Sequence, residues 1–240
     1  MPLTKSLKER NRQPEWMDEP DIAVDLHHDA LTGLARVNRF SSAVGSIWGP
    51  VSKLAAKSIR PLRVLDVACG GGDVATSLQA MANRKGVPIQ VVGCDISETA
   101  IEFAAERAKQ RKVEISFVQN DVLNEDLPGG FDLIYSSLFL HHLEFDQIVH
   151  VLKSMRSSAS RCIVINDLLR SSLGYALAKW GIRVLTRSKV CHVDGPLSVE
   201  AALTMDEARS VAQQAGMQNI TLRRCWPERF LMVWHNDAEQ

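Results

Sequence analysis

The sequence predicts an α/β protein built on one mostly parallel, seven-stranded sheet. From Pro61 onward, short apolar runs rich in β-branched residues alternate with segments of helical periodicity. A glycine-rich turn at residues 70–72 directly follows the first of these runs. Near the end of the chain, two β-rich runs are separated only by Pro227, Glu228 and Arg229, a link so short that it requires an antiparallel hairpin.

The first 60 residues are expected to form an arm and a helical cap. Residues 1–20 are polar, carry three prolines and are interpreted as a mobile arm. Between Asp21 and Ala56, apolar side chains recur at helical spacing. Pro50 is expected to divide this region into at least two helices, because proline interrupts the hydrogen bonding of a helix.

Residues 61–240 are expected to form the core, with helices on both faces of the sheet, because parallel strands need right-handed crossover connections. Ser97, and Thr204 with Glu207, supply helix start signals. Residues 168–203 are an insertion, expected to serve as a lid or substrate segment. Strands are predicted at residues 63–68, 89–96, 113–119, 131–137, 161–167, 220–226 and 230–235. Helices are predicted at residues 73–84, 97–111, 144–157 and 204–215.

Composition excludes several classes of protein. The 28 basic residues balance 28 acidic ones, which argues against a partner such as nucleic acid that is bound through broad phosphate neutralisation. No uncharged apolar stretch is long enough for a membrane span, and the N-terminus lacks the apolar segment of a signal peptide. The five cysteines form no C-x-x-C pair and are expected to be buried in a reducing cytoplasm. We therefore expect the partner to be a small molecule. The sequence does not indicate the oligomeric state.

The glycine turn predicts a bound nucleotide-like ligand. Gly70, Gly72 and Ala75 satisfy the dinucleotide pattern G-x-G-x-x-G/A, so a nicotinamide or flavin enzyme is one alternative. Asp66 favours another ligand, because a carboxylate near the turn repels a pyrophosphate and attracts a cationic amino-acid group. The glycines allow the backbone to approach that ligand closely.

Acidic residues at the ends of the next two strands supply matching contacts. Asp95 is placed to accept hydrogen bonds from the two hydroxyls of a ribose. Asp121 can accept from the exocyclic amine of adenine, and Val122 can donate its amide to the ring. The fourth strand ends in small polar residues, including Ser137, beside the expected reaction centre.

These segments resemble the class I S-adenosylmethionine-dependent methyltransferases, which have a Rossmann-like fold and a glycine motif of the form acidic-x-G-x-G. The chain departs from that motif with Ala68 at the first glycine, a variant also found in ubiquinone and menaquinone C-methyltransferases. Residues 17–20, 31–38 and 192–196 further resemble small bacterial methyltransferases that accompany type III polyketide synthases.

The resemblance implies S-adenosylmethionine as cofactor and S-adenosylhomocysteine as product. Arg36 lies in a helical region that covers the cofactor in similar folds, where a guanidinium suits the cofactor's carboxylate. The alternative is that Arg36 is a solvated charge. The residues expected to bind the cofactor are Asp66, Ala68, Cys69, Gly70, Gly72, Asp95, Ile96, Asn120, Asp121, Val122, Ser137 and Arg36.

His141 and His142, which follow the fourth strand, are the candidate bases for removing a proton from the acceptor. The alternative is a structural role for one of the pair, and sequence does not choose between them. Asp167, at the end of the fifth strand, can orient a histidine or bind the acceptor hydroxyl. A structural ion pair between Asp167 and Arg170 is the competing interpretation.

Three residues are candidates for acceptor binding. Asn166 and Arg170 lie where open α/β sheets bind ligands, and Arg170 suits an anionic substrate group. Trp180 belongs to an apolar stripe that is either core or the wall of an acceptor pocket. A metal site of the catechol-methyltransferase kind is not expected, because Ser136 and Ser137 stand where its further carboxylate would lie.

The leading hypothesis is methylation of a hydroxyl on a small aromatic or polyketide-derived molecule. C-methylation of a quinone-type precursor is the alternative within the same class, motivated by Ala68. A nicotinamide-dependent oxidoreductase is the alternative from another class, motivated by the glycine spacing.

Overall fold

The computed structural model describes residues 7–19 and 21–236, and it confirms the predicted mixed sheet. The strand order is β3-β2-β1-β4-β5-β7-β6. Neighbouring strands are parallel from β3 through β5, and β7 is antiparallel to both β5 and β6. The strands are β1 (Leu62–Val67), β2 (Ile89–Asp95), β3 (Ser116–Gln119), β4 (Phe131–Ser137), β5 (Ala159–Leu168), β6 (Thr221–Cys225) and β7 (Arg229–His235).

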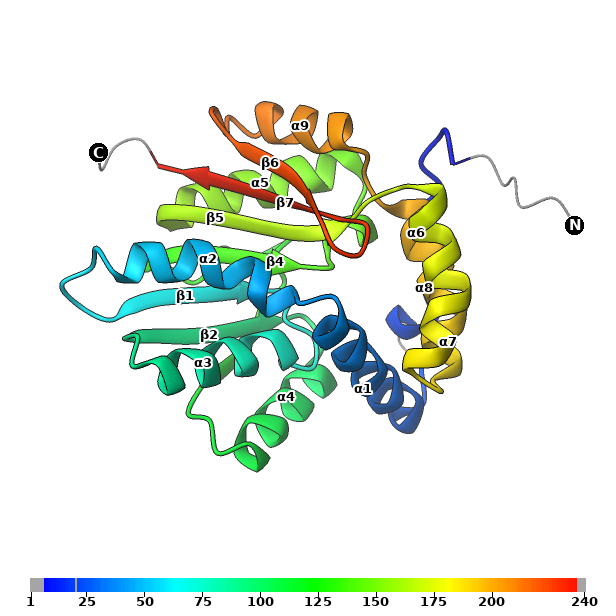
Figure 1. Cartoon of the computed structure of the whole chain (residues 1–240), viewed down its shortest axis with the longest axis horizontal. Helices are drawn as coiled ribbons and strands as arrows, with labels where there is room; N and C mark the ends of the chain where they lie inside the picture. Colours follow the sequence, from blue (N-terminus) through cyan, green and yellow to red (C-terminus); the bar gives the residue numbers. More distant parts are fainter. Residues whose placement is uncertain (1–6, 20, 237–240) are drawn as a thin grey trace, which may run out of the picture.

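Helices cover both faces of the sheet (Figure 1). One apolar core joins α5 and α9 to the sheet, and a second joins α2 and α3 to the opposite face. The longer helices are α1 (Val24–Phe40), α2 (Ala43–Ala55), α3 (Asp73–Lys85), α4 (Glu98–Gln110), α5 (Phe145–Ser158), α8 (Lys189–Ala201) and α9 (Met205–Gln214). The shorter ones are η1 (Trp16–Asp18), η2 (Leu140–His142), α6 (Ser172–Ala176), the π-helical η3 (Leu177–Gly181) and α7 (Ile182–Leu185).

Most predicted strands and helices lie within three residues of their expected bounds, and the differences have local causes. The third strand begins at Ser116 rather than at residue 113, because the amide of Val113 donates to the carbonyl of Ala108 and closes α4. Lys112 supports this turn with a φ of 54°. The predicted helix break at Pro50 is wrong. The break falls at Ser42, whose φ is 53°, and Pro50 lies inside α2.

The helix α2 tolerates Pro50 because tertiary packing outweighs one lost hydrogen bond. Ile47, Val51 and Leu54, on both sides of the proline, are buried in the core shared with β1 and α3. Burial of these side chains holds the helix together across the interruption.

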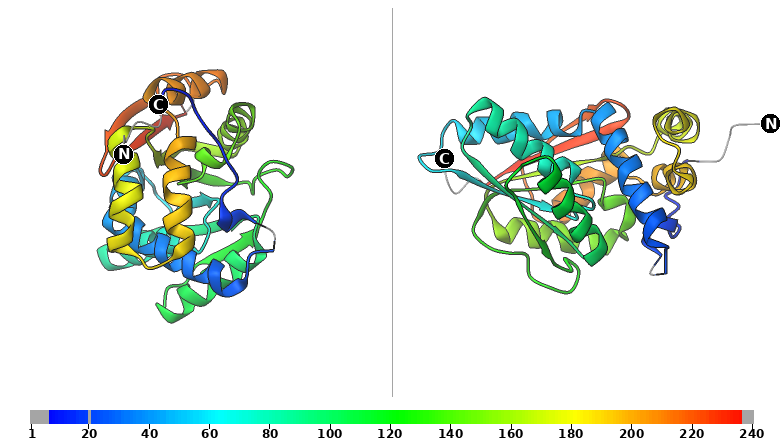
Figure 2. Two further views of the ribbon diagram at one scale, coloured as in Figure 1. Left: turned by 90° about the vertical axis from the view of Figure 1, so that its right-hand side faces the viewer. Right: turned by 90° about the horizontal axis from the view of Figure 1, so that it is seen from below.

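The carboxyl ends of the parallel strands face a group of helices formed by α1 and α6–α8 (Figure 1). Residues 7–19, called the strap below, run beside α8 in the left view of Figure 2. They were expected to belong to a mobile arm. Instead, Arg10 donates to the carbonyls of His141, Leu143 and Ala201, so the strap is packed onto the loop after β4. Residues 1–6 and 20 of the expected arm lie outside the described residues.

No helix within the described part of the chain is long and apolar enough to cross a bilayer. Four of the five cysteines are buried as expected, and Cys225 is partly exposed. All five are free thiols.

Candidate active site

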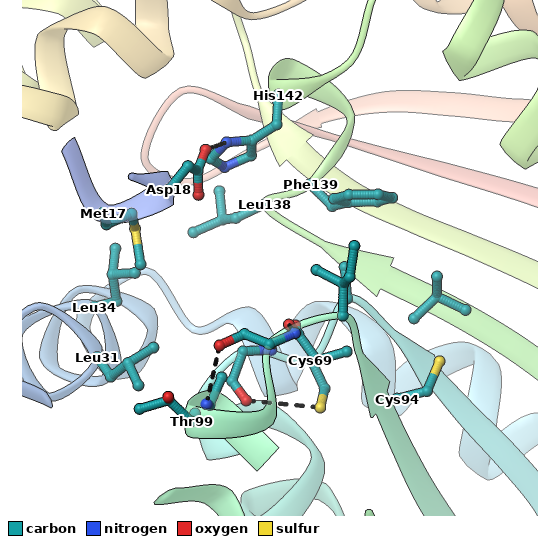
Figure 3. Close-up of a pocket in the computed structure, with 18 of the residues that line it drawn as sticks. Met17, Asp18, Leu31, Leu34, Cys69, Cys94, Thr99, Leu138, Phe139 and His142 are labelled. Atoms are coloured by element: carbon teal, nitrogen blue, oxygen red, sulfur yellow. Dashed lines mark hydrogen bonds and ion pairs between the residues drawn. The ribbon is translucent and has the colours of Figure 1, made fainter. Parts of the chain in front are cut away.

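A cavity of about 490 Å³ lies at the carboxyl ends of β1, β2, β3 and β4. In Figure 3, Leu31 and Leu34 of α1, with Met17 of the strap, lie across the cavity from Cys69. Most of the residues predicted to bind the cofactor line this cavity, which is called the cofactor cavity below. They are Ala68, Cys69, Gly70, Asp95, Ile96, Asn120, Asp121, Val122 and Ser137.

Asp95 fixes the glycine turn as well as lining the cavity. Its Oδ2 accepts a hydrogen bond from the amide of Gly70 at 2.7 Å, and its Oδ1 accepts from the amide of Ser97 at 3.0 Å. Burial raises the pKa of Asp95, although both amide bonds favour its ionised form. Gly70 has a φ of 49°, a conformation that costs glycine little. The carboxylate of Asp95 is therefore held rigidly at the end of β2.

Polar groups on two other strand ends are left for a ligand. The hydroxyl of Ser137 and the Oδ1 of Asn120 are buried, line the cavity and have no hydrogen-bond partner in the described structure. Buried polar atoms of this kind are costly unless a ligand or water satisfies them. Asp121 lies beside Asn120 and accepts from the amide of Leu123 at 3.0 Å. A ligand with hydroxyl and amine groups, such as an adenosyl cofactor, fits this set of unpaired groups and carboxylates.

Three predicted cofactor residues do not line the cavity. Asp66 is 2% exposed and accepts a hydrogen bond from Tyr135 at 2.7 Å. Burial raises the pKa of Asp66 well above its ordinary value, and its carboxyl group faces Tyr135 instead of the cavity. A Cβ on Gly72 would lie 2.8 Å from the ring of Phe117, so this glycine permits packing beneath the turn. Arg36 is exposed on α1.

A second cavity, of about 410 Å³, adjoins the first and is called the acceptor cavity below. The two cavities share Met17, Leu34, Leu138 and His142 as lining residues. Most of the remaining wall is apolar and comes from α1, η3, α7, α8 and the end of β5. Its aliphatic residues include Val37, Leu168, Leu177, Ile182, Val184, Leu185 and Val199.

His141 lines the acceptor cavity and is held by Asp167. The two side chains meet at 2.7 Å between Nδ1 and Oδ1, and both are buried. The Oδ2 of Asp167 accepts from the amides of Phe139 and Leu140, which fixes the carboxylate relative to the loop. Burial raises the pKa of Asp167, but His141 and the amides of Leu168 and Leu140 lower it by more, so the pKa is depressed overall. An ionised Asp167 favours a proton on Nδ1 and leaves Nε2 of His141 free to accept one.

His142 lines both cavities and pairs with the strap. Its Nδ1 lies 2.8 Å from Oδ2 of Asp18. Figure 3 shows the two side chains facing each other. Burial lowers the pKa of His142, but Asp18, Glu15 and Asp167 raise it more strongly, to about 9. His142 therefore carries a proton at neutral pH. The two adjacent histidines therefore differ in their partners, because His141 pairs with Asp167 of β5 and His142 pairs with Asp18 of the strap.

Glu15, which the sequence analysis did not single out, also enters the acceptor cavity. Its carboxylate is buried, accepts a hydrogen bond from Ser198 at 2.7 Å and lies 3.9 Å from Nε2 of His141. Side-chain atoms of Glu15, His141 and His142 all lie within 4.8 Å of one another. The resemblance at residues 17–20 was the only sequence signal near Glu15, and it did not point to this contact.

The predicted acceptor-binding residues lie outside the cavity wall. Asn166 is fully buried, and its Oδ1 accepts from Arg229 at 3.2 Å. Arg170 forms an ion pair with Glu207 at 2.6 Å instead of with Asp167. Trp180 is 60% exposed, although the adjoining parts of its helix line the cavity. Sequence periodicity placed the helix correctly at the cavity but did not indicate which side chains face inward.

Arg229 is a further buried group that the sequence did not reveal. It is 2% exposed at the start of β7 and donates to Asn166 and to Asn38 of α1. Burial lowers the pKa of Arg229 to about 10, despite the nearby charge of Asp167. Arg229 is also a lining residue of the acceptor cavity, so these hydrogen bonds join α1, β5 and β7 at the cavity wall.

Comparison with known proteins shows similarity to methyltransferases. Residues 64–160 match the model of a methyltransferase domain. The chain is 25% identical over 211 residues to a ubiquinone biosynthesis O-methyltransferase of Bordetella parapertussis. This alignment covers 79% of this chain and 82% of that protein. It is 28% identical over 107 residues to a demethylmenaquinone methyltransferase of Thermus thermophilus, over 44% of this chain and 47% of that protein.

Solved structures show the same fold. The plantazolicin methyltransferase BpumL, in complex with S-adenosylhomocysteine, superposes with a TM-score of 0.59 at 18% identity and covers 92% of this chain and 91% of its own. Human N-acetylserotonin methyltransferase, in complex with S-adenosylmethionine, superposes with a TM-score of 0.63 at 16% identity, over 89% of this chain and 56% of its own.

Proposed function

We propose that this chain, a class I methyltransferase that uses S-adenosylmethionine, transfers the methyl group to a hydroxyl of a small, largely apolar, aromatic acceptor. The observation that carries the proposal is the placement of the His141–Asp167 pair. His141 lies in the wall of an apolar cavity that adjoins the cofactor cavity, and Asp167 holds it from behind that wall. A hydroxyl needs a base for methylation, and this imidazole is oriented to serve as one.

Bound S-adenosylmethionine supplies a methyl group on a positively charged sulfur. We assign its ribose to Asp95 and its adenine to Asp121 and the amide of Val122. Asn120 and Ser137 offer their unpaired oxygens to the same ligand.

In the acceptor cavity, Nε2 of His141 takes the hydroxyl proton, and the carboxylate of Asp167 stabilises the imidazolium that forms. The aliphatic wall excludes water and orients the aromatic ring. His142, paired with Asp18 at the boundary of both cavities, fixes that boundary in place. Because both cavities share Leu138, an acceptor held against it lies next to the cofactor, where proximity lowers the barrier.

The test is a screen of small phenols and pyrones with a methyl-labelled cofactor, followed by mass spectrometry to locate the label. Label on oxygen supports the proposal. Label on ring carbon would instead support C-methylation of a quinone-type precursor, the alternative motivated by Ala68. Calorimetry with NADPH and with S-adenosylmethionine completes the test, because binding of the nicotinamide cofactor alone would contradict any methyl transfer.

A quinone precursor is a reasonable first member of the panel. The Bordetella parapertussis relative is named for ubiquinone biosynthesis and O-methylation, and it aligns with most of this chain. Pyrones belong in the same panel because of the resemblance at residues 31–38 and 192–196. The cofactor assignment does not depend on which acceptor is methylated.

A further inference from the structure

Glu15 is a buried carboxylate in a cavity whose wall is otherwise largely aliphatic. It is 5% exposed, and a buried charge of this kind is costly unless it is paired or hydrogen-bonded. An ionised carboxylate has about four acceptor sites, and the hydroxyl of Ser198 fills one of them at 2.7 Å. The Nε2 of His141, at 3.9 Å, is beyond hydrogen-bond distance. Acceptor capacity therefore remains at the cavity wall.

The position of Glu15 is fixed by its neighbours on the strap. The amides of Trp16 and Met17 donate to the two carboxylate oxygens of Asp194 on α8, at 2.9 and 3.0 Å. On the other side of Glu15, Arg10 donates to carbonyls around η2. The backbone is thus fixed before and after Glu15, and this places its carboxylate beside His141.

We propose that Glu15 recognises a second hydrogen-bond donor on the acceptor, a hydroxyl or an amine adjacent to the oxygen that His141 deprotonates. This inference rests on the proposed function. An acceptor oxygen that donates to Nε2 lies about 3 Å from it, and this places the neighbouring ring substituent beside Glu15. A carboxylate accepts hydrogen bonds and cannot donate them. The site therefore selects acceptors with vicinal donors. Although His142 and Arg229 line the same cavity, the charge of Glu15 disfavours a carboxylate at that ring position.

The test compares acceptors that differ only in this substituent: 1,2-dihydroxybenzene, phenol, 2-methoxyphenol and 2-hydroxybenzoate. A hydrogen bond to a charged group contributes about 1.5–3 kcal/mol, so the wild-type kcat/KM for the vicinal diol should exceed that for phenol by roughly 10- to 150-fold. The variant Glu15→Gln removes the charge and keeps the shape. It should reduce this ratio several-fold and should improve the relative rate with 2-hydroxybenzoate.

Glu9→Gln is the matched control, because Glu9 lies on the same strap and is exposed. It should leave the acceptor ratios at their wild-type values. A purely structural role of Glu15 would lower kcat/KM for all four acceptors alike, and that result would overturn the proposal. If Glu15→Gln does not fold, Ser198→Ala, which removes the donor that orients the carboxylate, should reduce the same ratio.

Calorimetry with the S-adenosylhomocysteine-loaded protein separates this inference from the proposed function. Preferential binding of the diol that depends on Glu15, without any methylation, would support recognition by Glu15 and contradict the proposed reaction. Methylation of phenols without preference for the diol would do the reverse. A preference that disappears in wild-type protein after treatment with a chelator would assign recognition to a cation among Glu15, His141 and His142, and would overturn the direct contact.

Discussion

Replacing His141 with alanine separates the chemical step from cofactor binding. The substitution removes the imidazole whose Nδ1 is 2.7 Å from Asp167 and leaves the acceptor hydroxyl without a base. General-base catalysis contributes about 10²–10⁴ to a rate, which corresponds to about 3–5.5 kcal/mol of barrier. The affinity for S-adenosylmethionine should stay close to wild type, because His141 lines the acceptor cavity and not the cofactor cavity.

The protein should remain folded, because Asp167 keeps other partners. Its carboxylate still accepts from the amides of Phe139, Leu140 and Leu168 at 3.1, 2.6 and 2.7 Å. The lost hydrogen bond to a charged group should reduce the free energy of unfolding by about 1.5–3 kcal/mol. Urea unfolding of the variant measures this loss separately from the rate.

The assay is single-turnover transfer of a labelled methyl group to a neutral phenol at saturating cofactor. His150→Ala, on the exposed side of α5, is the matched control and should keep the wild-type rate. An acceptor already ionised at the assay pH needs no base and should be much less sensitive to His141→Ala. A near-native rate for His141→Ala with the neutral phenol would refute the base role and would leave proximity as the source of catalysis.

Three further predictions concern the cofactor cavity and its boundary. Asp95→Ala should weaken S-adenosylmethionine binding by about 1.5–3 kcal/mol in calorimetry, and unchanged affinity in a folded variant would contradict its ribose contact. Gly70→Val should weaken cofactor binding further, because valine is strained at a φ of 49° and its side chain would contact the ligand. A clash within the protein is not the cause, since the nearest side-chain atom, on Leu31, is 3.8 Å from an added Cβ. If Gly70→Val loses as much free energy of unfolding as free energy of cofactor binding, that result would count against a contact between this residue and the ligand. The His142–Asp18 pair should stabilise the fold fully below the unfolded pKa of about 6.5 and lose this effect as pH rises through about 9, because the folded pKa of His142 is raised. Asp18 is half exposed, so the pair should contribute about 0.2–1 kcal/mol to the free energy of unfolding. Urea unfolding of wild type and His142→Gln at pH 6 and pH 10 measures this contribution. A difference between the two proteins that does not change with pH would contradict the prediction.

The fold was predictable because its signals are local. Apolar runs, the glycine turn and the short link before β7 each depend on neighbouring residues, and all seven strands lie where those signals placed them. Pro50 was misleading because burial of Ile47 and Val51 decides the helix there. That burial depends on contacts with distant β1 and α3, which no local pattern encodes.

The site was predictable where it follows strand ends. Residues at the carboxyl ends of β1 to β4 share one edge of a parallel sheet, so Asp95, Asp121 and Ser137 could be assigned to one cavity. Asp66 precedes the end of its strand and points instead into the core, toward Tyr135. Glu15 and Arg229 could not be found in the sequence, because their partners Ser198 and Asn38 lie 183 and 191 residues away.

The separation along the chain between the strap and its partners has a consequence for the order of folding during synthesis. The strap is synthesised long before its partners. Arg10 binds the carbonyl of Ala201, 191 residues later, and Trp16 binds Asp194, 178 residues later. Contacts of such long range form after the sheet is complete, because closing so large a loop is entropically costly. The sheet edge that carries Asp95 therefore forms before the strap closes either cavity, since Met17 of the strap lines both of them. In the mature protein, amide hydrogen exchange should be faster in the strap than in β1 or β4.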